Sequence, residues 1–162
     1  MDAGTDTLRT AWQLRALRTS DLELVCRHRE QLFLEAGRAP ALVAQMRAPF
    51  REWLQRHFAA GTYVGWIAER DGRAAGGAGF IELDWPPHTF HPDQARRGYV
   101  LNVFVEPEFR GAGCAKALMR AVESEMRARG IDYCTLHATD AGRPLYDALG
   151  WNATNEMAKR LG

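Results

Sequence analysis

The chain has 162 residues, which is the length of one domain, and its 46% apolar and 25% charged residues match an ordinary globular protein. This composition excludes disordered and fibrous classes. The 21 Lys and Arg residues against 20 Asp and Glu leave a net charge of +1, so charge gives no reason to expect a nucleic-acid or membrane partner.

The cysteines and the N-terminal segment indicate a cytoplasmic protein. Cys26, Cys114 and Cys134 are odd in number and lack C-x-x-C spacing, which argues against a disulfide framework or a zinc site. The N-terminal residues lack the apolar stretch of a secretory signal, and no run approaches the ~18 apolar residues of a membrane helix.

The first elements in chain order are a strand and two helices. Residues 1–10 are expected to be a loose lead-in, and the alternation over residues 12–17 predicts a short strand. A helix is predicted over residues 22–34 and a second one over residues 41–58, where Pro49 marks a candidate break.

A β-hairpin follows. Strands are predicted over residues 62–69 and 74–83, joined by the turn signal Asp71-Gly72. Glycines at 76, 77 and 79 indicate that another backbone or a ligand approaches this second strand closely. Residues 84–97 form a polar loop containing His88, His91 and Asp93, which we interpret as solvated rather than as metal ligands.

The second half alternates strands and helices. The apolar run 99–105 predicts a strand buried on both faces, followed by a helix over residues 113–129. A strand over residues 131–138, a short helix over residues 140–149 and a final strand over residues 154–161 complete the chain. The element order predicts an α/β domain on a mixed sheet.

Residues 105–115 (VEPEFRGAGCA) leave the buried strand and enter a helix through two glycines. Such a helix start offers free N–H groups and a positive dipole end to an anion. A P-loop is excluded because Ala117 follows Lys116, and a dinucleotide fingerprint fails because Lys116 stands at its third glycine position. A pyrophosphate loop of the form R-x-x-G-x-A, with Arg110, Gly113 and Ala115, remains.

This loop, together with the segment LYDALGW at residues 145–151, resembles the GNAT superfamily of acyl-CoA-dependent N-acetyltransferases. The resemblance is carried by motifs from residue 99 to 161 and by element order alone over residues 12–98. It implies a GNAT-like mixed, mostly antiparallel sheet flanked by helices, with a central parallel βαβ cofactor-binding unit. It also implies that residues 1–162 form a single domain.

The resemblance also assigns roles to residues. The backbone of Val103, Phe104 and Val105 would pair with the pantetheine arm of acetyl-CoA, and Tyr146 would lie beside the thioester sulfur. Arg110 would open the pyrophosphate loop. The N–H groups that would hold the pyrophosphate belong to Gly111, Ala112, Gly113, Cys114 and Ala115.

The transfer reaction needs an oxyanion donor and a proton donor. A backbone N–H, for which we choose Val103, would stabilise the tetrahedral oxyanion. The Tyr146 phenol would protonate the departing thiolate, although a tyrosine between Leu145 and Leu149 could instead pack in the core. We interpret Cys114 as a small packed residue rather than an activated thiol.

The general base is the least determined group. Glu82 is our choice among Glu82, Asp84, Asn102 and Glu106, and the alternative is deprotonation through water by surface carboxylates. Three aromatic residues could line the acceptor pocket or fill the core, and the sequence does not choose between these roles. They are Trp66, Trp85 and Phe90.

The predicted function is direct transfer of an acetyl group from acetyl-CoA, as co-substrate and without a metal, to a primary amine of a small molecule or peptide. The alternative is a non-catalytic acyl-CoA-binding or regulatory module. Transfer of a bulkier acyl group and assembly as a homodimer are left open.

Overall fold

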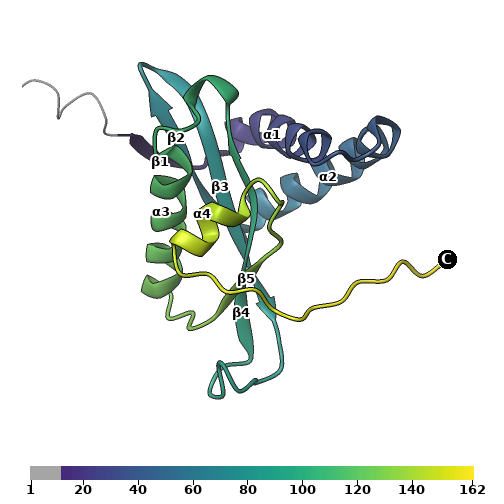
Figure 1. The fold of residues 1–162 in the computed structure, drawn as a ribbon, viewed down its shortest axis with the longest axis vertical. Helices are drawn as coiled ribbons and strands as arrows, with labels where there is room; N and C mark the ends of the chain where they lie inside the picture. Colours follow the sequence, from purple (N-terminus) through teal and green to yellow (C-terminus); the bar gives the residue numbers. More distant parts are fainter. Residues whose placement is uncertain (1–11) are drawn as a thin grey trace, which may run out of the picture.

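The computed structural model describes residues 12–162, so the predicted lead-in at residues 1–10 lies outside the described residues. Five strands form one sheet in the order β1-β2-β3-β4-β5 (Figure 1). The strands are β1 (Gln13–Ala16), β2 (Tyr63–Arg70), β3 (Arg73–Asp84), β4 (Arg96–Val105) and β5 (Cys134–Leu136). The α-helices are α1 (Leu22–Glu35), α2 (Pro40–Ala60), α3 (Cys114–Ala128) and α4 (Arg143–Ala148).

The sheet is mixed. Strands β1 to β4 pair antiparallel in chain order, and β5 pairs parallel with β4 after the crossover through α3. The predicted mostly antiparallel sheet with a parallel βαβ unit is therefore confirmed.

Each face of the sheet has its own hydrophobic core because side chains alternate along the strands. Phe80 and Val100 pack on one face with the apolar stripe of α3, and their neighbours Ile81 and Leu101 pack on the other face against α1 and α2. Figure 1 shows α3 on the left of the sheet, α4 in front of it and α1 and α2 to its right.

Helix α2 is continuous through Pro49, so the candidate break there is wrong. A proline inside a helix removes one hydrogen bond. The buried side chains of Val43, Phe50 and Leu54 lie on both sides of Pro49, and their packing holds the two halves in one helix.

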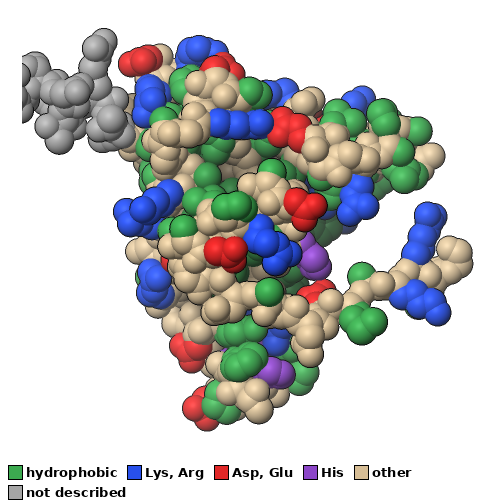
Figure 2. Space-filling model, viewed as in Figure 1, with side chains coloured by type: hydrophobic (Ala, Val, Ile, Leu, Met, Phe, Trp, Pro, Cys, Tyr) green, Lys and Arg blue, Asp and Glu red, His purple; other side chains and the backbone are tan. Residues whose placement is uncertain are grey.

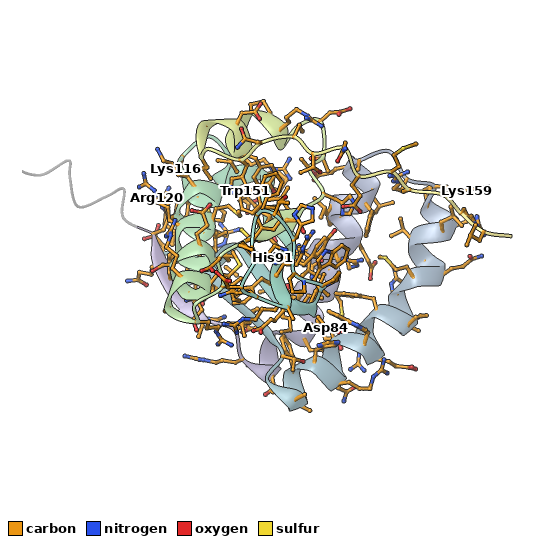
Figure 3. The ribbon with its side chains drawn as sticks, turned by 90° about the horizontal axis from the view of Figure 1, so that it is seen from below. Asp84, His91, Lys116, Arg120, Trp151 and Lys159 are labelled. Atoms are coloured by element: carbon orange, nitrogen blue, oxygen red, sulfur yellow. The ribbon has the colours of Figure 1, made fainter. Side chains whose placement is uncertain are left out.

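The final strand predicted over residues 154–161 is also wrong. This segment has no regular structure and runs away from the sheet (Figure 1), with Lys159 well away from α3 (Figure 3). Its two large apolar side chains, Met157 and Leu161, are 93% and 86% exposed. Since the segment buries neither of them, it has no apolar face that would hold it against β5.

Charges of both signs are interspersed over the face shown in Figure 2, in keeping with the net charge of +1. Within residues 12–162, no helix has both the length and the apolar character needed to cross a membrane.

Candidate active site

Strands β4 and β5 separate after a short pairing, and a cleft opens between them. Their register joins only Gly98 to Val100 with Cys134 to Leu136, so the β4 backbone from Leu101 to Val105 has no strand partner on the β5 side among residues 12–162. The cleft has a volume of about 560 Å³ and is lined by β4, α1, the start of α3 and α4. An unpaired strand edge facing a cavity can hydrogen-bond an extended ligand.

A β-bulge lies on β4 at this cleft. Leu101 pairs with Gly79 and Phe104 with Gly77, so β4 carries one more residue than β3 between these pairs. Asn102, within the bulge, has φ +57°. This left-handed conformation is uncommon outside glycine, and asparagine tolerates it better than most residues.

The side chain of Asn102 is held from two sides. Its Nδ2 donates to the Tyr63 hydroxyl at 3.0 Å, and Arg29 Nη1 donates to its Oδ1 at 2.8 Å. Burial raises the pKa of Tyr63 to about 12, so the hydroxyl stays neutral. These contacts fix the bulge, and strain at such a residue is a common feature of functional sites.

Two glycines of β3 allow the Tyr63 side chain and the β4 backbone to approach β3 closely. A Cβ on Gly79 would lie 2.6 Å from the Tyr63 hydroxyl, and one on Gly76 would lie 2.5 Å from the carbonyl oxygen of Phe104. The predicted close approach of another backbone is confirmed at Gly76, whereas at Gly79 the neighbour is a side chain.

The glycine loop forms the end of the cleft nearest α3. Gly111 and Gly113 have φ +75° and +79°, and a Cβ at either would meet nothing within 4 Å. The first-turn N–H groups of α3 have no intrahelical partner and are available to an anion. Gly111, Gly113, Cys114 and Ala115 line the cleft, whereas Ala112 does not and its carbonyl accepts from Trp12 Nε1 at 3.0 Å.

Arg110 lines the cleft but is already bonded to the protein. Its Nε donates to the carbonyl oxygen of Val105 at 2.9 Å, and its Nη2 donates to both carboxylate oxygens of Glu35 on α1 at 2.9 Å. Arg110 therefore fastens the glycine loop to β4 and α1, and Glu35 balances its charge.

Two further predicted residues lie at the cleft. Cys114 is buried in the core and burial raises its pKa to about 11, which agrees with a packed residue and not with an activated thiol. Tyr146 of α4 lines the cleft and is only 9% exposed, and burial raises its pKa to about 12. Its phenol therefore carries a proton at neutral pH.

Glu82 lies away from the cleft. It follows Phe80 on the α3 face of β3 and pairs with Arg96 at 3.0 Å. Glu106, another candidate base, pairs with Arg27 and lies 3.1 Å from His28 Nε2. Neither carboxylate lines the cleft.

Sequence reasoning missed His137, which follows β5 and lines the cleft. Its Nδ1 contacts the Tyr99 hydroxyl, and its Nε2 lies 3.4 Å from Glu156 Oε1. A histidine near the carboxyl end of the strand predicted over residues 131–138 was the signal available, because ligands commonly bind outside the carboxyl ends of parallel strands.

The three aromatic residues left open lie outside the cleft lining. Trp66 packs against the core, Trp85 covers the guanidinium of Arg97 at 4.0 Å, and Phe90 stacks on Tyr133.

His91 has partners other than a metal. Its Nε2 lies 3.1 Å from Arg97 Nη2, and its Nδ1 lies 3.0 Å from the carbonyl oxygen of Gln94. In Figure 3, His91 lies near the centre of the view and apart from Lys116 at the start of α3. Residues 12–162 contain no cluster of three or more His, Cys, Asp or Glu side chains that could bind a metal.

Comparison with known proteins decides the family. Residues 26–151 match the model of the acetyltransferase (GNAT) family. The chain belongs to the GNAT family. The resemblance inferred from the glycine loop and the LYDALGW segment is thereby confirmed.

Solved GNAT structures are similar over nearly the whole chain. A GCN5-related N-acetyltransferase from Ralstonia eutropha JMP134 is 47% identical with a TM-score of 0.91, covering 93% of this chain and 99% of that one. A predicted acetyltransferase from Clostridium acetobutylicum, solved with acetyl-CoA, is 25% identical with a TM-score of 0.84, covering 93% of this chain and 96% of that one.

A curated relative matches over a shorter stretch. Glucosamine 6-phosphate N-acetyltransferase of Trypanosoma brucei brucei is 34% identical over 64 residues, which is 40% of this chain and 43% of that enzyme. The match therefore spans less than half of the relative's length.

Proposed function

We propose that this GNAT protein transfers an acetyl group from acetyl-CoA directly to a primary amine of a small molecule or peptide. The observation that carries the proposal is the cleft between β4 and β5. It combines an unpaired strand edge, a glycine loop at a helix start and a buried phenol.

The cofactor would use backbone groups. Val103, Phe104 and Val105 offer their unpaired edge to the amides of the pantetheine arm. The N–H groups from Gly111 to Ala115 and the dipole of α3 face the pyrophosphate. Arg110 acts here by holding the loop, since Glu35 already occupies its guanidinium.

The reaction follows from the groups at the bulge. The neutral amine attacks the thioester carbonyl, and the Val103 N–H next to Asn102 stabilises the oxyanion. When the carbon–sulfur bond breaks, Tyr146 gives its proton to the thiolate, and it recovers through solvent the proton that the attacking nitrogen loses as the amide forms. Supporting this role, Tyr146 lines the cleft and its raised pKa keeps it protonated.

The amine must lose a proton before it attacks, and His137 is better placed than Glu82 to accept it. His137 lines the cleft, and its Nε2 lies 3.4 Å from Glu156 Oε1. Its Nδ1 contacts the Tyr99 hydroxyl, so the amine's proton would pass to that hydroxyl as the hydroxyl gives its own proton to Nδ1. A carboxylate beside an imidazole stabilises the imidazolium that forms.

Two measurements test the proposal. Acetyl-CoA at ~100 times its Kd should stabilise the protein by ~2.7 kcal/mol in a thermal melt, and no shift at any concentration would refute cofactor binding. Thiol release is then measured over a panel of amino sugars, aminoglycosides, amino acids and polyamines. Tight binding without turnover on the whole panel would leave the non-catalytic acyl-CoA-binding module as the function.

A further inference from the structure

Arg29 is a partly buried cation beside the cleft. It lies on α1 and reaches β4, where Nη1 donates to Asn102 Oδ1 at 2.8 Å. Its guanidinium lies 4.9 Å from the ring centroid of Phe33 and 4.5 Å from that of Phe50. The side chain is therefore held in one position by an amide and two aromatic rings.

No carboxylate balances this charge among residues 12–162. None of the ion pairs there includes Arg29. Arg15, by contrast, pairs with two carboxylates, those of Asp21 and Glu69. The Nε of Arg29 is buried without a hydrogen-bond partner, and burial lowers the pKa of the group. A guanidinium stays charged in proteins even so, and a buried charge without a counter-ion is costly.

One edge of the guanidinium stays open. Nη2 makes no hydrogen bond to the described residues, and unlike Nε it is not shut off from solvent. Two neighbours of Arg29 line the cleft. They are Asn102, its hydrogen-bond partner on β4, and Leu32, which lies one turn along α1. Arg29 is thus hydrogen-bonded directly to the bulge, where the proposed reaction takes place.

A group of opposite charge, Glu156, also acts on Tyr99. Burial raises the pKa of the Tyr99 hydroxyl, the charge of Glu156 raises it further, and the charge of Arg29 lowers it. Glu156 is also next to His137. Arg29 does not itself line the cleft but donates to Asn102, which does, and His137 lines it as well. A cation at Arg29 and a proton acceptor at His137 complement a molecule with an anion and an amine.

We propose that Arg29 binds a carboxylate or phosphate group of the acceptor, so that the acceptor is an amine that also carries an anion. This rests on the proposed function. The open Nη2 group carries two N–H donors, and an arginine nitrogen makes strong charge-assisted hydrogen bonds to carboxylate and phosphate oxygens.

The test uses amines in matched pairs with acetyl-CoA and thiol-release detection. The pairs are L-phenylalanine with its amide, O-phosphoethanolamine with ethanolamine, and glucosamine 6-phosphate with glucosamine. The anionic member of at least one pair should have a kcat/KM at least ~10-fold higher, which is ~1.4 kcal/mol. The carboxylate and phosphate pairs distinguish the two sources of the anion.

Substitutions then assign the preference to one side chain. R29Q should reduce this preference for the anionic member to less than ~3-fold, and R29K should keep part of it because the charge remains. The control R47Q removes an exposed arginine that pairs with Glu30, and it should keep the full preference.

Other outcomes overturn the proposal. Equal rates within every pair would do so, and so would an equal loss on both members in R29Q, since that indicates that Arg29 only positions Asn102. If no amine is turned over, calorimetry of the same pairs on the CoA complex decides the case. Arg29-dependent binding would then support the anion site, while the absence of turnover refutes the proposed catalysis. No binding of any anionic amine would refute the anion site itself.

Discussion

Replacing Gly113 with alanine separates the conformational role of the glycine loop from its role in binding. Gly113 has φ +79°, and an added Cβ meets no protein atom within 4 Å. The cost to folding is therefore that of the left-handed conformation alone, ~1–2 kcal/mol. At ~2–4 °C per kcal/mol for a chain of this length, the melting temperature should fall by roughly 2–8 °C.

The effect on binding should be larger than the effect on folding. Gly113 lines the cleft at the start of α3, so the new methyl group occupies space that the pyrophosphate needs to reach the N–H groups. Charge-assisted hydrogen bonds form at ~2.7–2.9 Å, and the methyl group prevents this approach. The Kd for acetyl-CoA should rise at least ~10-fold, a loss of ~1.4 kcal/mol.

Gly61→Ala is the matched control. Gly61 ends α2 with φ +66°, also meets nothing within 4 Å, and lies outside the cleft lining. Thermal melts and calorimetric titrations with acetyl-CoA should show a similar destabilisation in both variants and weaker binding in Gly113→Ala only. If Gly113→Ala binds acetyl-CoA as tightly as the unaltered protein, the assignment of this loop to the pyrophosphate is wrong.

Three other substitutions test the site and the fold. Tyr146→Phe should lower kcat at least ~10-fold and leave the Kd for acetyl-CoA unchanged; equal turnover would remove the phenol from the mechanism. Tyr63→Phe leaves a buried N–H of Asn102 without its acceptor, which should cost ~1–3 kcal/mol in a denaturant titration. Burial alone would raise the pKa of Asp21, but hydrogen bonds from Arg15 and the backbone hold it below the ordinary value. Because the folded-state pKa is lowered, this stabilisation is present at pH 7 and is lost as the pH falls below about 4. Asp21→Asn should therefore destabilise the protein more at pH 7 than at pH values below the ordinary pKa of an aspartate.

The sequence predicted the elements that have strong local signals. The continuous apolar run gave β4, and the apolar stripe ending at Gly130 gave α3, each within a few residues of the observed bounds. The glycine loop was recognisable because its function depends on backbone conformation, which glycine reveals directly. Such features are encoded by residues adjacent in the chain.

The missed features depend on contacts between distant residues. Arg29 and Asn102 are 73 positions apart, and neither shows in its own surroundings that it meets the other. Glu82 was chosen from its place at a strand end, but its face of the sheet follows from the register of β3 with β4. The predicted strand at residues 154–161 failed because its apolar residues face no neighbouring surface.

The lengths of the strands bear on how this protein avoids aggregation. Both outer strands of the sheet are short, with four residues in β1 and three in β5, whereas β3 and β4 have twelve and ten and lie inside. Short edges give a second polypeptide little to pair with. The longer unpaired edge, on β4, lies in a recess bounded by α1 and α4, where a ligand can enter but a strand of another molecule cannot readily add. The backbone left unpaired for binding is thus protected from self-association.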